Sequence, residues 1–137
     1  IQDRFGVEQK GAMTAAMQNL MCLFDSLKLC KFLLHAGVKV HLILEWFNLV
    51  TDWDFDQAEF LLTGERLFNL KRLYNVRLGI SRKDDTISPR ILTLKKGGGA
   101  DDNLPPLGRM LSEYYEVRGW NEQGIPTPET LARVGLA

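Results

Sequence analysis

The feature that most constrains the fold is a long apolar stretch near the N-terminus, residues 11–34. It is rich in Ala, Met and Leu, which favour the α-helix, and it is apolar on nearly every face of such a helix. A helix without a polar face must be covered by other elements on more than one side. We therefore predict a long helical region from Gly11 to about Leu34, ending near Gly37 and buried within a helical assembly.

Helical signals also dominate the rest of the chain, and no period-2 alternation of useful length appears. A second helix is predicted over Val38–Val50, where apolar residues follow i, i+3, i+4 spacing. A third helix should run from about Phe55 to Leu78. Its start carries Asp54 and Gln57, which can form a capping box with the free backbone groups there.

Glycines and prolines mark the remaining boundaries. Gly79 is the expected residue after the third helix, and Gly64 inside that helix predicts a close packing contact. A polar loop is predicted at Ser81–Arg90, in which Asp84 and Asp85 cap backbone donors, and a flexible segment follows at Lys95–Asp102. A further helix should run from about Leu104 to Arg118 and stop at Gly119. A short last helix should begin at Thr127, Pro128 and Glu129. The fold class is therefore all-α with about five helices, and residues 1–137 are interpreted as a single helical domain.

Length and charge narrow the classes of function. The 137 residues include 17 basic and 17 acidic ones, so the net charge is zero, and neither nucleic-acid binding nor membrane binding is expected. No apolar run approaches the roughly 20 residues of a membrane span, and no signal-peptide pattern opens the sequence. Two cysteines are too few for a secreted disulfide scaffold, which favours a reducing, cytoplasmic setting. The start at Ile1 indicates a trimmed chain or a piece of a longer protein.

Few residues could carry chemistry by themselves. His35 and His41 lie six positions apart, which does not align two metal ligands on one helical face, so both are interpreted as ordinary histidines at a surface or interface. Cys22 lies in the apolar run and should be buried. Aromatic residues that recur at roughly helical spacing are interpreted as core: Trp46, Phe47, Trp53, Phe55, Phe60, Phe68 and Tyr74. Taken alone, these patterns indicate only a helical domain.

Asp25 and Cys30 stand out because of their surroundings. A carboxylate beside an apolar helix needs hydrogen-bond donors or a cation; Asp25 could face solvent, pair with Lys28, or bind a cofactor. A thiol flanked by Lys28 and Lys31 is biased towards thiolate, the form that binds metal, although Cys30 could equally be an inert packed residue.

The stretch DSLKLCKF, residues 25–32, resembles the C-terminal Asp-x-x-Gly-Leu-Cys motif of tungsten-containing aldehyde ferredoxin oxidoreductases. Three further blocks resemble that family in the same order: GERLFNLKRLYNVR, RKDDT followed by Arg90, and MLSEYYEVRGWNEQGIPTPETLARVGL. The similarity covers nearly the whole chain. The chain thus resembles the last, helical domain of an enzyme several times longer.

The resemblance implies a role for each motif residue. Cys30 would be the fourth ligand of a 4Fe-4S cluster whose other three thiolates lie upstream. Asp25 would hydrogen-bond the amino-pyrimidine edge of one of two pterins that hold tungsten (or molybdenum), and the backbone of Leu29 would lie beside that pterin. Lys28 departs from the motif's glycine, a residue used where the backbone approaches a ligand closely or takes positive φ. The residues that handle substrate protons lie upstream, so no catalytic residue is assigned and Glu45 is not nominated.

In the resembled enzymes an aldehyde and water become a carboxylate, and two electrons pass through the cluster to ferredoxin. We therefore expect a fragment or separate subunit of such an oxidoreductase, inactive alone, whose partner is the remainder of the enzyme or a companion subunit. One alternative keeps the fold and changes the substrate to an aromatic acyl-CoA. Another is a helical module that has lost the cofactor and only binds partners. The fragment hypothesis predicts an exposed apolar face around Leu20–Leu34.

Overall fold

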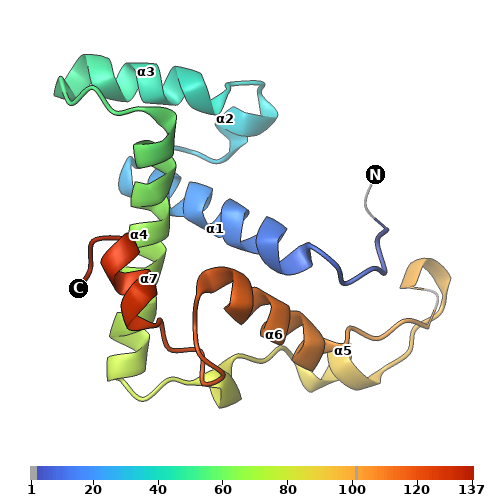
Figure 1. Cartoon of the computed structure of the whole chain (residues 1–137). Helices are drawn as coiled ribbons and strands as arrows, with labels where there is room; N and C mark the ends of the chain where they lie inside the picture. Colours follow the sequence, from blue (N-terminus) through green and yellow to red (C-terminus); the bar gives the residue numbers. More distant parts are fainter. Residues whose placement is uncertain (1–2, 101) are drawn as a thin grey trace.

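The computed structural model describes residues 3–100 and 102–137, and these residues form an all-α fold, as predicted (Figure 1). The elements are α1 Lys10–Ser26, α2 Phe32–His35, α3 Val40–Thr51, α4 Gln57–Arg77, the 3₁₀ turn η1 Arg82–Asp84, α5 Pro89–Thr93, the 3₁₀ turn η2 Gly98–Ala100, α6 Leu107–Arg118 and α7 Pro128–Arg133. The predicted number of about five helices is close, since α2 and α5 are single short turns.

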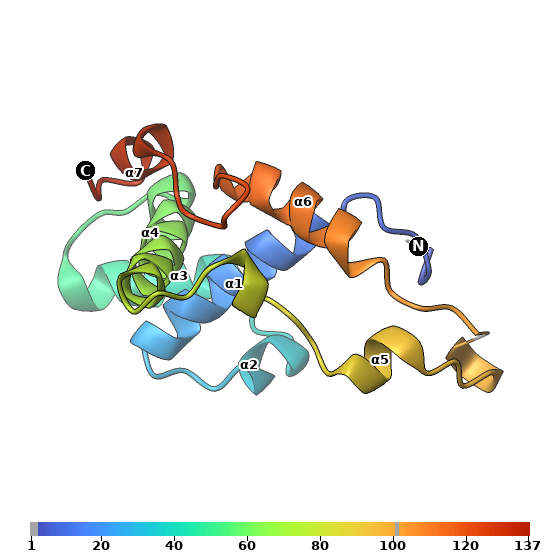
Figure 2. The same cartoon turned by 90° about the horizontal axis from the view of Figure 1, so that it is seen from below.

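Helix α1 lies at the centre and packs against both α4 and α6 (Figures 1 and 2). Both crossings depend on glycine. A Cβ at Gly64 of α4 would lie 2.4 Å from the carbonyl oxygen of Asn19, and a Cβ at Gly11 of α1 would lie 2.9 Å from the backbone nitrogen of Tyr114. Backbones can approach this closely only where the side chain is missing. The close contact predicted at Gly64 is therefore confirmed, and so is the cover of α1 on more than one side.

The hydrophobic core lies where the second half of α1 meets α3 and the start of α4. Its buried members are Leu23, Phe24, Ile43 and Phe60. Half-buried residues pack around them: Leu20, Met21, Leu27, Leu29, Leu33, Leu34, Val38, Val40, Leu44, Phe47 and Phe55. Because so many of these come from residues 20–34, the loop after α1 is anchored through its leucines.

Two predicted helix boundaries are wrong. The region Gly11–Leu34 is not one helix, because α1 ends at Ser26 and the chain turns before α2. The third helix is not capped by Asp54, which has a positive φ of 52°; it starts two residues later, where Asp56 accepts a hydrogen bond of 2.8 Å from the backbone N–H of Glu59. At its other end Gly79, with φ of 88°, follows α4 as predicted.

The polar segment Ser81–Arg90 contains η1 and the start of α5 instead of a plain loop. Asp84 caps it as predicted and accepts from the backbone N–H of Ser81 at 2.8 Å. Asp85 does not cap the backbone; its carboxylate binds Arg72 and Tyr115. In Lys95–Asp102 the chain forms η2, and Asp101 lies outside the described residues.

The last two helices follow the prediction closely. Helix α6 begins at Leu107, three residues later than expected, and ends at Gly119, whose φ of 64° is left-handed. Helix α7 is capped by Thr127, whose hydroxyl accepts from the backbone N–H of Thr130, with Pro128 at the first helical position. Within residues 3–100 and 102–137, no helix combines the length and apolar character that crossing a membrane requires.

The apolar surface lies elsewhere than predicted. Of the large apolar residues in 20–34, only Phe32 is strongly exposed, because its neighbours pack into the core. Exposed apolar side chains lie instead on α1, on and after α3, and on α4: Met13, Met17, Trp46, Leu49, Val50, Trp53, Leu61, Leu70, Tyr74 and Leu78. The assignment of Trp46, Trp53 and Tyr74 to the core was therefore wrong, whereas Phe60 is buried as predicted.

Candidate functional site

The predicted motif residues occupy the turn that ends α1. This turn is a Schellman motif: the N–H of Lys28 bonds the carbonyl of Asp25 at 3.4 Å, and the N–H of Leu29 bonds that of Phe24 at 2.9 Å. The second bond folds the chain back, so Asp25 and Cys30, the residues that follow Phe24 and Leu29, lie at the same end of α1. The turn thus groups the three predicted site residues.

Lys28 stands at the left-handed position of the turn, with φ of 58°. Four other helices end in the same pair of hydrogen bonds, and each has glycine there: Gly37 after α2, Gly79 after α4, Gly119 after α6 and Gly135 after α7. A left-handed conformation costs about 1–2 kcal/mol for a residue with a Cβ. The motif's glycine is therefore explained by backbone geometry, and this chain keeps that geometry despite the lysine.

Asp25 is exposed, and its partner comes from another helix. The carboxylate lies 3.5 Å from the Nζ of Lys71 on α4, and 72% of its side-chain surface is accessible. It pairs with Lys71 and not with Lys28, the local partner considered from the sequence. Partial burial disfavours the charged form of Lys71, but the nearby Cys22 and Asp25 outweigh it and raise the pKa of the ammonium. Asp25 therefore keeps most of its acceptor capacity available.

Leu29 and Cys30 face different surroundings. Leu29 is half-buried and packs against the core, which fixes its backbone in place. Cys30 is an exposed free thiol, whereas Cys22 is buried as predicted. The two are not joined by a disulfide. Among the described residues, no group of three or more His, Cys, Asp and Glu side chains could hold a metal ion. A metal group bound at Cys30 would need its other ligands from outside these residues.

His35 and His41 are both exposed. The ring of His35 lies 5.8 Å from that of Phe32, and neither histidine belongs to a group that could hold a metal within the described part of the chain. Their exposure agrees with the prediction that they lie at a surface or interface.

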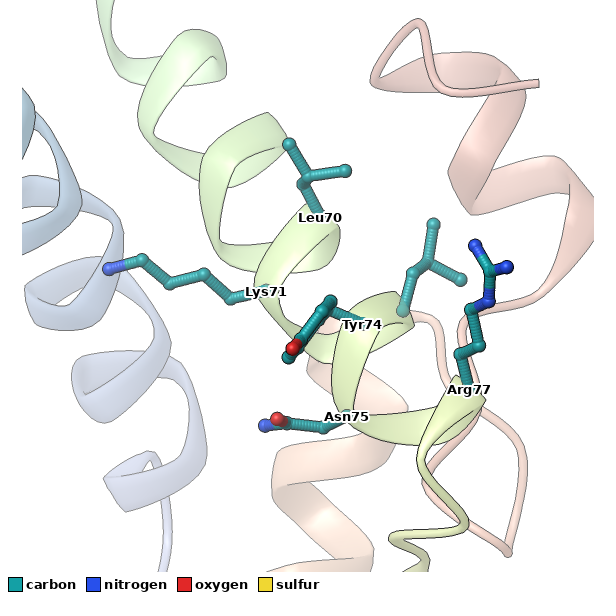
Figure 3. A pocket seen from close by; sticks show the side chains of 6 residues that line it. Leu70, Lys71, Tyr74, Asn75 and Arg77 are labelled. Carbon is teal, nitrogen blue, oxygen red and sulfur yellow. The ribbon is translucent and has the colours of Figure 1, made fainter.

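A groove runs along the exposed face of α4 close to this turn (Figure 3). It measures about 720 Å³ and is lined by Leu70, Lys71, Leu73, Tyr74, Asn75 and Arg77. Figure 3 shows Lys71 reaching away from the groove towards α1, on which Asp25 lies. The open face of α4 and the motif turn are thus linked through one ion pair.

The sequence reasoning missed a buried polar network behind the site. Arg72, 7% exposed, donates to both carboxylate oxygens of Asp85 at 2.7 and 2.9 Å and to the carbonyl of Gly124 at 2.7 Å. The hydroxyl of Tyr115 donates to Asp85. Burial and this hydrogen bond raise the pKa of Tyr115 to about 12. Burial also disfavours the Asp85 anion, but Arg72 and Tyr115 outweigh it and lower the pKa of that carboxyl.

A second buried arginine joins α6 to α1. Arg118 is 1% exposed and donates to Asn19 at 2.6 Å and to Gln18 at 2.7 Å. Its guanidinium lies 3.9 Å from the centre of the Phe68 ring on α4. Hydrogen-bond acceptors and aromatic rings surround this cation, so burying its charge has only a modest desolvation cost. The guanidinium thereby connects three helices. The later motif blocks of the sequence contain these buried polar residues: Arg72, Asp85, Tyr115 and Arg118. Their place in those blocks was the signal from which they could have been found.

The matches to known proteins extend over nearly the whole chain. A family model described as "Aldehyde ferredoxin oxidoreductase, domains 2 & 3" matches residues 1–136. The chain is 33% identical over 131 residues to a tungsten-containing aldehyde ferredoxin oxidoreductase of Pyrococcus abyssi, covering 94% of this chain and 21% of that protein. It is 33% identical over 132 residues to the protein of the same name from Pyrococcus furiosus, with 95% and 22% covered.

A relative with another name shares the domain. An aliphatic sulfonate oxidoreductase, WOR-like subunit, of Pyrococcus furiosus is 28% identical over 122 residues, covering 82% of this chain and 19% of that protein. The chain therefore spans about a fifth of the length of these curated relatives.

Proposed function

Because the chain belongs to the aldehyde ferredoxin oxidoreductase family, we propose that it is the C-terminal cofactor-binding part of a longer tungsten (or molybdenum) oxidoreductase. The complete enzyme would oxidise aldehydes to carboxylates with ferredoxin as electron acceptor, as the names of its relatives suggest. This chain would be inactive by itself, since it supplies only part of the site. A cytoplasmic setting remains a prediction from its cysteine content.

The observation that carries the proposal is the turn after α1. It holds an exposed free thiol at Cys30 and an exposed carboxylate at Asp25, both at the end of the helix that packs against α4 and α6. We assign Cys30 as the single cluster ligand from this chain. Its sulfur is exposed and not part of a disulfide, so it would be free to bind iron as a thiolate.

The remaining residues of the turn fit a pterin. The carboxyl oxygens of Asp25 offer hydrogen-bond acceptors, which suit the N–H groups of an amino-pyrimidine edge. Leu29 packs its half-buried side chain against the core and so presents its backbone at a fixed place. When bound, the metal–pterin and cluster would supply the redox chemistry, while this chain's residues bind and orient them.

The substrate is the least constrained part of the proposal. The relative named for aliphatic sulfonates carries a similar domain, and a fold does not fix a substrate. An aldehyde is favoured because the relatives with the higher identity carry that name.

The test is a matched pair of cysteine variants in the complete enzyme, purified anaerobically. Cys30→Ala should lose the cluster, measured as iron content and as its electron paramagnetic resonance signal. Cys22→Ala removes the same atom from a buried position and should keep about four irons per protomer. Asp25→Asn should lower tungsten and pterin content while leaving the iron in place. Equal iron in both cysteine variants would remove Cys30 from the site.

A further inference from the structure

We propose that Lys71 on α4 is a positioning residue for Asp25, the carboxylate proposed to bind the pterin. In this role its ammonium holds the Asp25 side chain in one orientation before the cofactor arrives, so less conformational freedom is lost on binding. The inference rests on the proposed function for the ligand of Asp25. It adds to that site a residue from another helix, 46 positions away in the sequence.

The backbone at both ends of this ion pair is held by buried neighbours. On α1, Asp25 directly follows Phe24, whose side chain is 2% exposed and belongs to the core. On α4, Lys71 directly precedes Arg72, which is buried and donates to both carboxylate oxygens of Asp85. The freedom that remains to the pair therefore lies in the torsions of its own two side chains.

The crossing of α1 and α4 directs Lys71 towards Asp25. Gly64 makes the close contact of this crossing, and Lys71 follows it by seven residues, about two turns, on the same face of α4. Figure 3 shows the Lys71 side chain reaching from α4 to α1. Its ammonium also lies near Cys22, which is one turn before Asp25 on α1. The lysine thus lies along α1 and ends beside the motif turn.

The ion pair leaves room for a ligand at the carboxylate. The Nζ of Lys71 lies 3.5 Å from Oδ2 of Asp25, and within residues 3–100 and 102–137 Oδ1 accepts no hydrogen bond. A carboxylate offers about four lone-pair sites, so one ammonium does not saturate it. A ligand with N–H groups can therefore bind Asp25 while Lys71 stays in contact with it.

The exposure of the pair indicates when it matters. The side chains of Lys71 and Asp25 are 59% and 72% exposed, and ion pairs so open to water contribute little to folding stability. A ligand that covers the carboxylate displaces water, and the attraction between the two charges then becomes stronger. The effect of Lys71 should therefore be found mainly in how well the cofactor is retained.

The experiment uses three lysine variants of the complete enzyme, purified anaerobically. Lys71→Met removes the ammonium and keeps most of the stem, whereas Lys71→Arg keeps a cation. Lys83→Met makes the same chemical change at an exposed lysine of η1 that takes part in none of the five ion pairs within the described residues. Tungsten and pterin contents are followed during incubation in cofactor-free buffer, with iron content and the thermal midpoint as controls.

We expect Lys71→Met to lose tungsten and pterin about two to five times faster than the wild type, which is the size that one ion pair can give. Its iron content and thermal midpoint should equal those of Lys83→Met, since a role in folding alone would lower both. Lys71→Arg should retain the cofactor nearly as well as the wild type. Equal retention by Lys71→Met and Lys83→Met would overturn the positioning role.

Combining Lys71→Met with Asp25→Asn shows whether the lysine acts through the carboxylate. The double variant should lose pterin no faster than Asp25→Asn alone, because the ion pair is already broken. Additive losses would overturn the proposal, since Lys71 would then act on the cofactor independently. If Asp25→Asn keeps the pterin, the proposed function fails and the positioning role with it. If Asp25→Asn loses the pterin and Lys71→Met does not, only the positioning role fails.

Discussion

Replacing Gly64 by alanine tests whether the crossing of α1 and α4 requires glycine. The new Cβ would lie 2.4 Å from the Asn19 carbonyl oxygen, 2.9 Å from its carbonyl carbon and 3.1 Å from Cγ of Leu23. Ordinary contacts need about 3.4 Å or more, so the two helices must separate by about 1 Å. The obstacle is backbone at the centre of the fold and cannot rotate away.

The change in the free energy of unfolding is the difference between two opposing contributions. Overpacking costs about 1–3 kcal/mol, and a clash with backbone belongs at the upper end. Alanine has a higher helix propensity than glycine, which stabilises the folded variant by about 1 kcal/mol. We therefore expect Gly64→Ala to lower the free energy of unfolding by about 2 kcal/mol. The shift of α1 would also disturb the hydrogen bond of 2.6 Å between Arg118 and Asn19.

Equilibrium urea unfolding followed by circular dichroism measures this change. Gly108→Ala is the matched control, because Gly108 lies in the first turn of α6 with no atom within 4 Å of the added Cβ. That variant should be stabilised by about 0.5 kcal/mol. If Gly64→Ala is stabilised to the same extent, the glycine is not required by packing and the reasoning about the crossing is wrong.

Two further changes probe the turn and the buried network. Lys28→Gly should raise the free energy of unfolding by about 0.5–1 kcal/mol. Glycine removes the strain of the left-handed conformation, and this gain exceeds the cost of the greater entropy of the unfolded chain. A lower midpoint of urea unfolding would mean that the lysine side chain stabilises the turn. Asp85→Asn should cost about 2 kcal/mol at pH 7, because it weakens the pair with buried Arg72. The pKa of Asp85 is lowered in the folded state, so its contribution is complete above about pH 4 and is lost as the pH falls further. The difference between wild type and variant should therefore stay constant from pH 7 to about pH 4 and shrink as the pH falls further, and a difference that does not shrink below pH 4 would contradict the assigned ion pair.

Local sequence signals located most of the helices and several of their ends. Thr127 followed by Pro128, and glycine at positions 79 and 119, act within one turn of chain, so their effect can be predicted without tertiary contacts. The end of α1 was missed because Lys28 stands where glycine would have marked it. Asp54 was preferred to Asp56 because both acids precede the same helix and only the packed structure distinguishes them.

The candidate site was found through resemblance of the motif and not through its chemistry. Asp25 and Cys30 are ordinary residue types, and within residues 3–100 and 102–137 no group of His, Cys, Asp and Glu side chains indicates a metal site by itself. Lys71 could not be paired with Asp25 from sequence, because 46 residues separate them and only the crossing of α1 and α4 brings them together.

The sequence by itself determined the all-α class, the apolar character of the first helix and the motif that groups Asp25, Leu29 and Cys30, because all three depend on short-range patterns. The tertiary structure decided which side chains meet. It paired Arg72 with Asp85 and placed the Arg118 guanidinium over the Phe68 ring of α4. These outcomes depend on how close two backbones can approach, and that distance is set at the helix crossings by Gly11 and Gly64.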